Sequence, residues 1–387
     1  MNWPLMYGNI SKSDLDEVKK IFDEDNPKLT QGPRVKQFET EWSKWLGVKH
    51  SIFVNSGSSA NLLTLAALKI LYPKGGEIIV PALTWSSDVV SVLKAGFTPK
   101  FVDIDLTTLG LNEKNIFNSI NKNTIAIFLT HCQGYSALSN ELLDLIKTKK
   151  IVLIEDVCES HGATHNNIKV GNFGLISNFS FYYAHHMTTI EGGMICTNDD
   201  ELSDIFRCIR GHGLLREMAN IEKIEKIKKE NPLLNSDFIF LYEGFNVRNN
   251  EISATIGLNQ IKSLNEKIKK RNENYFRFFD NLTNKNIYSD FKNDGLSNYA
   301  FNIISSYQDE TFYKKVLKLF NELNIEYRRG SAGGGNQLRQ PYLKNLKINK
   351  PKLPVTDHVH FFGSYIGNFP ELNNELIDYL VKRLNQL

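Results

Sequence analysis

Short apolar runs alternate with amphipathic stretches over residues 1–245, and this alternation constrains the fold more than any other feature of the sequence. The runs at 78–81, 124–129 and 151–154 have the composition of strands, and helical patterns such as 60–71 lie between them. Strands that alternate with helical patterns in this way predict βαβ units on a mainly parallel sheet. Because ligands of such α/β sheets bind at the carboxyl ends of the strands, polar residues at those ends are the candidates for a functional site.

The last third of the chain has a different pattern, which predicts an α+β unit. A helical pattern at 262–282 leads to a strand-like run at 299–304. An amphipathic helix at 311–323 then precedes a glycine-rich loop at 330–335, and a final helix is expected over 374–384.

These two patterns suggest two domains. We predict a large domain over residues 1–250 and a smaller C-terminal domain over residues 251–387. A highly charged segment at 221–231 is expected to form a solvated helix or a surface insertion.

Composition and charge exclude several classes of protein. With 387 residues, of which 41% are apolar and 23% charged, the chain is an ordinary globular one, and its net charge of +3 argues against nucleic acid as a partner. No apolar run is long enough to span a bilayer, and the start of the chain lacks the pattern of a signal peptide. Four cysteines without a C-x-x-C pair predict neither a zinc site nor a disulfide framework. We therefore expect a cytoplasmic enzyme that binds no metal and no membrane.

The segment NSGSSAN at 55–61 follows an apolar stretch and opens a helix. Its small residues would let backbone N–H groups approach an anion at the positive end of the helix dipole, which predicts a phosphate site. The alternative is an ordinary helix N-cap made by Ser58 or Ser59. The segment matches neither of the common glycine-rich nucleotide motifs, so both interpretations stay open.

Other candidates follow the predicted strands. Asp156 ends the run that starts at 151, and its carboxylate needs a helix terminus, a cation or a protonated heterocyclic nitrogen as its partner. Glu159 lies three residues further on. Trp85 follows the run 78–81, where an aromatic ring can stack on a planar ligand or simply pack. Adjacent His185 and His186 are expected to point in different directions, which favours one proton-transferring histidine over a two-histidine metal site.

Together these motifs resemble the pyridoxal-phosphate sugar aminotransferases, the DegT/DnrJ/EryC1/StrS family, over nearly the whole chain. The motifs that occur in the family's order are 55–61, 81–85, Glu155-Asp156 with 161–163, 180–185 with 191–193, and 244–248. The resemblance implies an α/β fold of the aspartate aminotransferase kind (fold type I). It also implies a homodimer whose active sites lie at the subunit interface.

The resemblance assigns roles to individual residues. It implies that Gly57, Ser58 and Ser180 bind the phosphate of the cofactor, that Trp85 stacks on its pyridine ring, and that Asp156 pairs with the protonated ring nitrogen, which keeps the ring an electron acceptor. Asn246 would contact the phosphate from the neighbouring subunit. Glu159 replaces a glutamine that the aminotransferases commonly carry near the ring oxygen.

One departure from the family is more informative than the matches. The aminotransferases have a lysine five residues after the phosphate-binding serine, where it forms a Schiff base with the cofactor. This chain has His185 there, and no lysine occurs between Lys169 and Lys223. Imidazole has no primary amine, so it cannot form an imine, but it can move a proton. Amino transfer through a lysine is therefore not expected.

Within the family, this exchange is typical of sugar C-3 dehydratases. One kind acts on a CDP-linked sugar with an iron–sulfur cluster held by C-terminal cysteines, and this chain has no cysteine after Cys208. The chain resembles the other kind, which acts on GDP-4-keto-6-deoxy-D-mannose without a metal. We expect noncovalently bound pyridoxal or pyridoxamine phosphate, L-glutamate as cosubstrate, and His185 as the base.

Two alternatives remain at this point, an aminotransferase that tolerates the histidine and a non-catalytic regulator that binds the cofactor or a nucleotide sugar. The nucleotide diphosphate or the glutamate carboxylate could be bound by Arg328, Arg329 and Asn336 in the loop region. A flexible connector with surface arginines is the other interpretation of that region.

Overall fold

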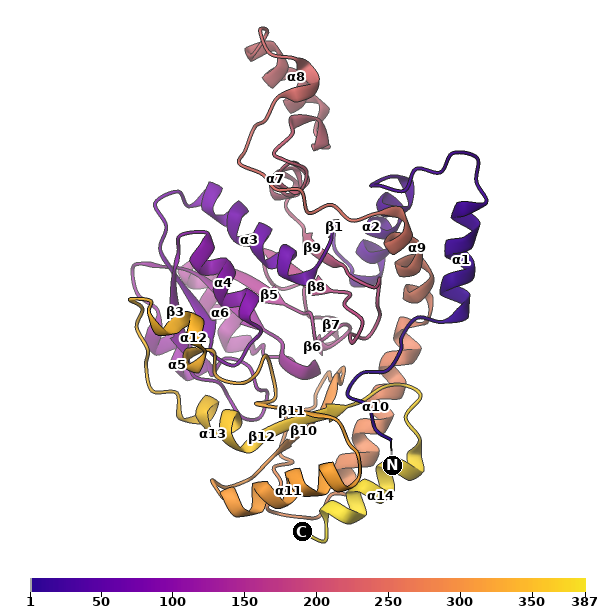
Figure 1. Ribbon diagram of the computed structural model, residues 1–387. Helices are drawn as coiled ribbons and strands as arrows, with labels where there is room; N and C mark the ends of the chain where they lie inside the picture. The colour runs from indigo at the N-terminus through magenta and orange to yellow at the C-terminus, as the bar shows by residue number, and fades with distance from the viewer. Residues whose placement is uncertain (1) are drawn as a thin grey trace.

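The computed structural model describes residues 2–387 and has a large sheet and a small sheet, each covered by helices (Figure 1). The strands are β1 His50–Val54, β2 Glu77–Pro81, β3 Thr98–Val102, β4 Thr124–Thr130, β5 Val152–Asp156, β6 Thr164–His165, β7 Ile168–Lys169, β8 Ile176–Ser180, β9 Gly193–Thr197, β10 Ala300–Ile304, β11 Tyr327–Arg329 and β12 Gly363–Gly367. The helices are α1 Lys12–Phe22, α2 Pro33–Leu46, α3 Gly57–Leu71, α4 Ser86–Lys94, α5 Glu113–Ser119, α6 Asn140–Lys149, α7 Asp200–Arg210, α8 Ile221–Glu230, α9 Glu251–Gln260, α10 Leu264–Asp280, α11 Glu310–Glu322, α12 Pro341–Lys344, α13 Pro354–Phe362 and α14 Asn374–Leu384.

The large sheet has seven strands in the order β1-β9-β8-β5-β4-β2-β3. β3, β2, β4, β5 and β8 run parallel, and β9 is antiparallel to both of its neighbours. This confirms the predicted mainly parallel sheet. Because β9 runs against β1 and β8, the carboxyl ends of β1, β8, β5, β4 and β2 all lie at one edge, where the site residues gather.

Helix α2 packs against β1 and α9. Glu251 of α9 accepts the backbone N–H groups of Gly32, Arg34 and Val35, which would otherwise have no partner in the first turn of α2. Gly47 ends the helix in the left-handed conformation, with a φ of 95°. Phe38 and Trp42 on the buried face are fully enclosed.

The small domain has a three-stranded antiparallel sheet in the order β10-β12-β11. α10 and α14 pack together, and the largest hydrophobic cluster contains residues from α10, α11, α14 and this sheet. The N-terminal segment joins this cluster, since Trp3 is fully buried and donates its indole N–H to the Gly367 carbonyl at 2.8 Å.

The predicted domain division at residue 250 places helix α9 in the small domain, but α9 packs on the large one. α9 packs against α1 and α2 on the large domain, although the sequence division places it in the small one. A short turn, Ile261–Ser263, follows α9 and leads into α10, which packs on α14. The domain limits of the sequence analysis stay a prediction, with this local difference.

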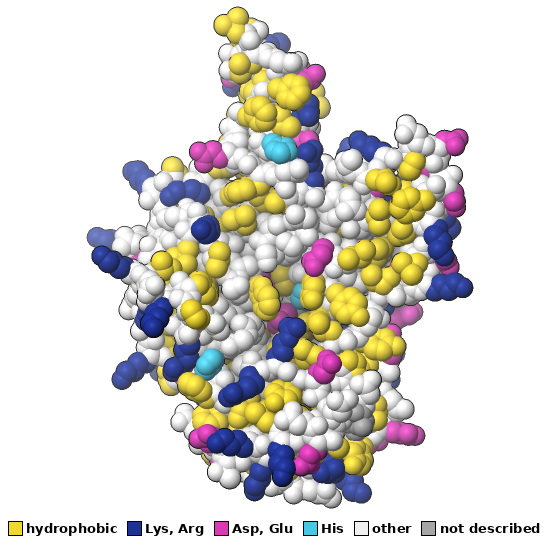
Figure 2. Space-filling model, in the orientation of Figure 1, with side chains coloured by type: hydrophobic (Ala, Val, Ile, Leu, Met, Phe, Trp, Pro, Cys, Tyr) yellow, Lys and Arg dark blue, Asp and Glu magenta, His cyan; other side chains and the backbone are white. Residues whose placement is uncertain are grey.

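The charged segment forms α8, on an arm that projects from the body of the molecule (Figure 1). Hydrophobic atoms are visible over the arm in Figure 2. The exposed apolar side chains of the arm are Ile221, Leu233, Leu234, Phe238 and Phe240. Leu233 is 98% exposed. No helix in residues 2–387 is both long and apolar enough to cross a membrane.

Candidate active site

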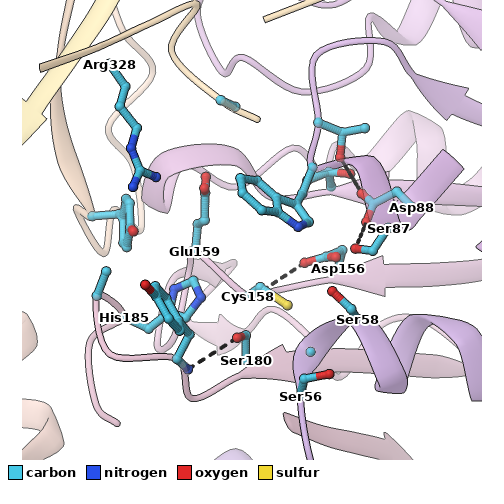
Figure 3. A pocket seen from close by; sticks show the side chains of 18 of the residues that line it. Ser56, Ser58, Ser87, Asp88, Asp156, Cys158, Glu159, Ser180, His185 and Arg328 are labelled. Atoms are coloured by element: carbon cyan, nitrogen blue, oxygen red, sulfur yellow. Dashed lines mark hydrogen bonds between the residues drawn. The ribbon is translucent and has the colours of Figure 1, made fainter. Parts of the chain in front are cut away.

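A cavity of about 280 Å³ lies between the carboxyl edge of the large sheet and the small domain (Figure 3). The residues that line it come from the ends of β1, β2, β4, β5 and β8, and from the small domain. They are Ser56, Gly57, Ser58, Thr84, Trp85, Ser87, Asp88, Thr130, Asp156, Cys158, Glu159, Ser180, Tyr182, Ala184, His185, Glu191, Tyr299, Arg328, Ala332 and Tyr365. None of them is a lysine.

The first wall of the cavity is the amino end of α3. Ser56 is the N-cap, and its hydroxyl accepts the Ser59 backbone N–H at 3.1 Å. The cap therefore lies two residues before Ser58 and three before Ser59, the two cap positions that the sequence suggested. Because Ser56 makes the cap, the Ser58 hydroxyl is free to face the cavity beside Ser180 (Figure 3). Hydroxyls and helix N–H groups in this arrangement can bind an anion.

Two glycines allow this wall to form. A Cβ on Gly57 would lie 2.6 Å from the Cβ of Ser180 and 3.1 Å from the Cys158 sulfur. A Cβ on Gly193 of β9 would lie 2.3 Å from the Ser56 carbonyl oxygen. Real side chains do not approach so closely, so the helix can reach the ends of β8 and β9 only with glycine at both positions.

Asp156 ends β5, as predicted, and its carboxylate lies in the cavity. One oxygen accepts the Cys158 backbone N–H at 2.9 Å, and the other accepts the Asn61 side-chain amide at 3.0 Å. Trp85 follows β2, is 55% exposed and lines the cavity. A planar ring placed between them would have an aromatic face and a carboxylate as neighbours.

The two adjacent histidines do point to different places. His185 lines the cavity, whereas His186 is fully buried and contacts the Ser297 carbonyl through Nε2 at 3.1 Å. His185 Nδ1 is buried without a hydrogen-bond partner, which leaves Nε2 as the nitrogen able to reach the cavity. Burial, and then the charge of Arg271, lower the pKa of His185 to about 3, so its imidazole is neutral at neutral pH.

Glu159 lines the cavity and lies near His185 (Figure 3). Its Oε2 accepts the Gln133 backbone N–H at 3.1 Å. Burial raises the pKa of Glu159 to about 7, against the opposing effect of the Gln133 N–H, with a further rise from Asp156. Glu159 can therefore hold or release a proton near neutral pH.

The three residues predicted to bind the nucleotide diphosphate or the glutamate carboxylate do not lie together in the structure. Arg328 lines the cavity, and its Nη1 donates to the Tyr365 hydroxyl at 3.3 Å. Arg329 points away and donates to the Phe361 carbonyl at 3.3 Å. Asn336 is buried, and its amide donates to Asp357 at 2.7 Å. Neither Arg329 nor Asn336 lines the cavity.

Asn246 also lies outside the cavity of its own chain. It is exposed, and its Oδ1 accepts the Arg248 Nε–H at 3.1 Å. Its expected contact with the phosphate of a neighbouring subunit stays a prediction.

Sequence reasoning missed several lining residues. Tyr299 and Tyr365 come from the small domain, and no motif marks them. Asp88 is in the first turn of α4, three residues after Trp85, and its proximity to a candidate residue is the signal that could have found it. Among residues 2–387, no group of three or more His, Cys, Asp and Glu side chains is placed to hold a metal ion.

The cavity fits pyridoxal phosphate on its own geometry. The glycine-dependent wall at Gly57 offers hydroxyls and helix N–H groups to a phosphate, and Asp156 offers an acceptor to a protonated ring nitrogen. His185, whose Nδ1 has no hydrogen-bond partner, lies at the far side of the cavity from Ser58 (Figure 3).

A mainly parallel sheet with an anion site and a carboxylate at its strand ends is the arrangement of a cofactor-binding α/β enzyme. The model of the DegT/DnrJ/EryC1/StrS aminotransferase family matches residues 9–385, and the chain belongs to this family. The predicted fold class is thereby confirmed.

Individual relatives are similar over their whole length. A GDP-4-keto-6-deoxy-D-mannose 3-dehydratase of Escherichia coli O55:H7 is 34% identical over 393 residues, which cover 98% of both chains. A solved mutant of GDP-4-keto-6-deoxymannose-3-dehydratase with bound GDP-perosamine has a TM-score of 0.91 and 33% identity, and covers 99% of this chain and 100% of its own. The same kind of enzyme with a trapped PLP-glutamate geminal diamine has a TM-score of 0.90 and 31% identity, with coverage of 99% and 100%.

Proposed function

We propose that this protein is a C-3 dehydratase of a GDP-linked 4-keto-6-deoxy sugar, GDP-4-keto-6-deoxy-D-mannose, and that it works with pyridoxal and pyridoxamine phosphate. L-Glutamate supplies the amino group, and 2-oxoglutarate and ammonia are released. The observation that carries the proposal is His185, which lines a cavity that has the features of a pyridoxal-phosphate site but no lysine among its lining residues.

The relatives support the cofactor and the substrates. Enzymes that are similar over their whole length are 3-dehydratases of GDP-4-keto-6-deoxymannose, and two of their structures contain a GDP-sugar and a PLP-glutamate adduct. When bound, the pyridoxamine form supplies a primary amine for the C-4 ketone and a ring that accepts an electron pair.

The residues of the cavity then divide the work. Ser58, Ser180 and the amino end of α3 hold the phosphate, and Trp85 covers the ring. Asp156 holds the proton at the ring nitrogen. His185 is neutral, so its Nε2 can first accept a proton from the carbon that carries the cofactor's amine. It then returns a proton to the C-3 hydroxyl, which departs as water.

The absence of a lysine in the cavity wall explains why water loss, not amino transfer, is favoured. A lysine would compete for the cofactor and return the amino group to the sugar. With His185 in its place, the unsaturated product can leave the cofactor and hydrolyse, which releases ammonia. The net change in the sugar is the replacement of its C-3 hydroxyl by hydrogen.

We further propose that the active protein is a homodimer in which Asn246 reaches the phosphate site of the partner subunit. Asn246 is exposed and outside its own cavity, and the nearby arm carries exposed apolar side chains such as Leu233 and Phe240. A surface of this kind is typical of a protein interface.

The decisive experiment is incubation with GDP-4-keto-6-deoxymannose, pyridoxal phosphate and L-glutamate. We expect a sugar product that has lost one oxygen atom, together with equal amounts of ammonia and 2-oxoglutarate. An amino sugar without ammonia would identify an aminotransferase. Absence of any spectral change of the bound cofactor on addition of glutamate would indicate a non-catalytic binding protein.

A further inference from the structure

A second carboxyl group, Asp88, lies beside Asp156 at the floor of the cavity (Figure 3). Its side chain is fully buried, and its hydrogen-bond partners in the described chain are all neutral. Oδ2 accepts the Thr130 hydroxyl at 2.8 Å and also contacts the Thr84 hydroxyl, while Oδ1 accepts the Asn61 amide at 2.8 Å.

One amide joins the two acids. Nδ2 of Asn61 donates to Asp88 Oδ1 at 2.8 Å and to Asp156 Oδ2 at 3.0 Å. The orientation of this amide is fixed, because its Oδ1 accepts the Asn178 side-chain amide at 2.9 Å. Both carboxyl groups are therefore held within hydrogen-bond distance of the same nitrogen atom.

The charge of this pair is not neutralised by the protein. None of the groups that hydrogen-bond to either carboxylate carries a positive charge. The titratable side chains Cys132, Cys158, Glu159 and Tyr342, whose pKa values respond to the charge of the pair, are not cationic either. Two ionised carboxylates cannot remain this close in a buried place without a cation, so the pair retains one proton. Burial, followed by the charge of Asp156, raises the pKa of Asp88 well above its ordinary range.

Both oxygens of Asp156 accept hydrogen bonds from N–H groups of the protein. One receives a backbone N–H and the other an amide N–H, and the carboxylate faces the cavity. Asp88 Oδ2 lies within hydrogen-bond distance of the hydroxyl oxygens of Thr84 and Thr130, and a hydroxyl oxygen can also accept the proton of a neutral acid.

We propose that Asp88 is a positioning residue that stays protonated and, through Asn61, keeps the single negative charge of the pair on Asp156. This inference rests on the proposed function, in which Asp156 faces the protonated ring nitrogen. One negative charge then meets one ring proton. If Asp88 were ionised, the one proton of the pair would be on Asp156. Asp156 would then be neutral, and the protonated ring nitrogen would lose its negatively charged partner.

The first test needs no cofactor and no substrate. Infrared difference spectra of the cofactor-free wild type against Asp88→Asn at neutral pH should show the carbonyl band of one protonated carboxylic acid, which is lost in the variant. The difference spectrum of wild type against the surface variant Asp144→Asn should contain no such band, because both proteins keep Asp88. A spectrum that shows only ionised carboxylate at Asp88 overturns the proposal.

The second test follows the ring nitrogen. In Asp88→Leu, which has similar size but no hydrogen bonds, we expect the dissociation constant of pyridoxal phosphate to rise at least tenfold. The pH at which the bound cofactor's absorbance titrates should fall by about one unit. Asp88→Asn, which resembles the neutral acid, should restore most of both properties.

Binding by Asp88→Leu that equals the wild type would overturn the positioning role, and so would a loss in Asp88→Asn as large as that in Asp88→Leu. Circular dichroism shows whether the variants fold, and the infrared test stands if Asp88→Leu does not. Failure of the wild type to bind pyridoxal phosphate would contradict the proposed function, whereas the protonation of Asp88 is measured independently of it.

Discussion

Gly57 and Ser180 lie so close together that a methyl group on the glycine would lie 2.6 Å from the Cβ of the serine. This contact brings the amino end of α3 to the end of β8. It therefore fixes the distance between the two groups of hydroxyls, at Ser58 and at Ser180, that the proposed phosphate site needs.

The Gly57→Ala variant tests this contact. The added methyl group must push α3 away from β8, so the dissociation constant of pyridoxal phosphate is expected to rise at least tenfold, which corresponds to about 1.4 kcal/mol. Fluorescence or absorbance titration measures it. Ser59→Ala is the control, because Ser59 does not line the cavity, and its affinity should stay within about twofold. Equal affinity of Gly57→Ala and wild type would show that the wall is not rigid.

His185→Asn tests the proposed base. The amide keeps the approximate size of the ring but cannot accept a proton at neutral pH, so water loss should fall by at least about a hundredfold while the cofactor still binds. Product mass and ammonia release measure the reaction. His165→Asn, at a histidine that contacts Asn140 away from the cavity, should retain activity. Retained turnover in His185→Asn would move the base to another residue, such as Glu159.

The absence of a lysine in the cavity wall gives a prediction for the wild type. Borohydride treatment of the protein with pyridoxal phosphate should leave no lysine in covalent linkage to the cofactor, as measured by mass spectrometry of peptides. A modified lysine at the site would contradict the assignment of His185.

Mixed dimers test the proposed sharing of the active site. If each site combines His185 of one chain with Asn246 of the other, His185→Asn and Asn246→Ala homodimers should both be weakly active. Mixing them after mild dissociation should restore one working site in each mixed dimer. Light scattering establishes the dimer itself. If the mixtures stay as inactive as their components although tagged subunits show that mixed dimers have formed, the two residues do not combine across the interface. Tagged subunits also show whether the chains have exchanged partners at all.

The raised pKa of Glu159 predicts a pH-dependent stability of the cofactor-free protein. Because the folded state binds this proton more tightly than the unfolded state, its contribution is present below pH 4.5 and is lost as the pH rises to about 7. The loss is about 3 kcal/mol. Urea unfolding of wild type and Glu159→Gln at several pH values isolates it. Glu266→Gln, at an exposed acid of α10, should leave the pH dependence unchanged.

The sequence predicted the elements well wherever a local pattern specifies them. The apolar run before Asp156 became β5, the segment after Val54 became α3, and the pattern at 374–384 became α14 with the same limits. His185 was singled out because its position relative to Ser180 is a matter of counting residues. Such features depend on neighbours a few residues apart, and helix and strand periodicity are therefore visible in the chain alone.

The candidate site was predicted less completely, because much of it is made by contacts between distant segments. Asn336 was a plausible ligand of the substrate by composition, but the fold turns its amide to Asp357. Ser58 was a possible cap, but Ser56 took that position and left Ser58 to the cavity. Hydrogen-bond competition of this kind depends on which donors and acceptors the fold places within reach of each other. The spacing of residues in the sequence does not reveal those partners.

By itself, the sequence determined the alternation of strands and helices in the large domain, the family resemblance and the exchange of lysine for His185. Only the tertiary structure decided that Asp88 and Asp156, 68 positions apart in the printed numbering, share one amide of Asn61 at the floor of the cavity. It also decided that Tyr299 and Tyr365 of the small domain close that cavity. The reason is physical: periodicity fixes which face of an element is buried, whereas the pairing of buried polar groups is fixed by the packing of elements against each other.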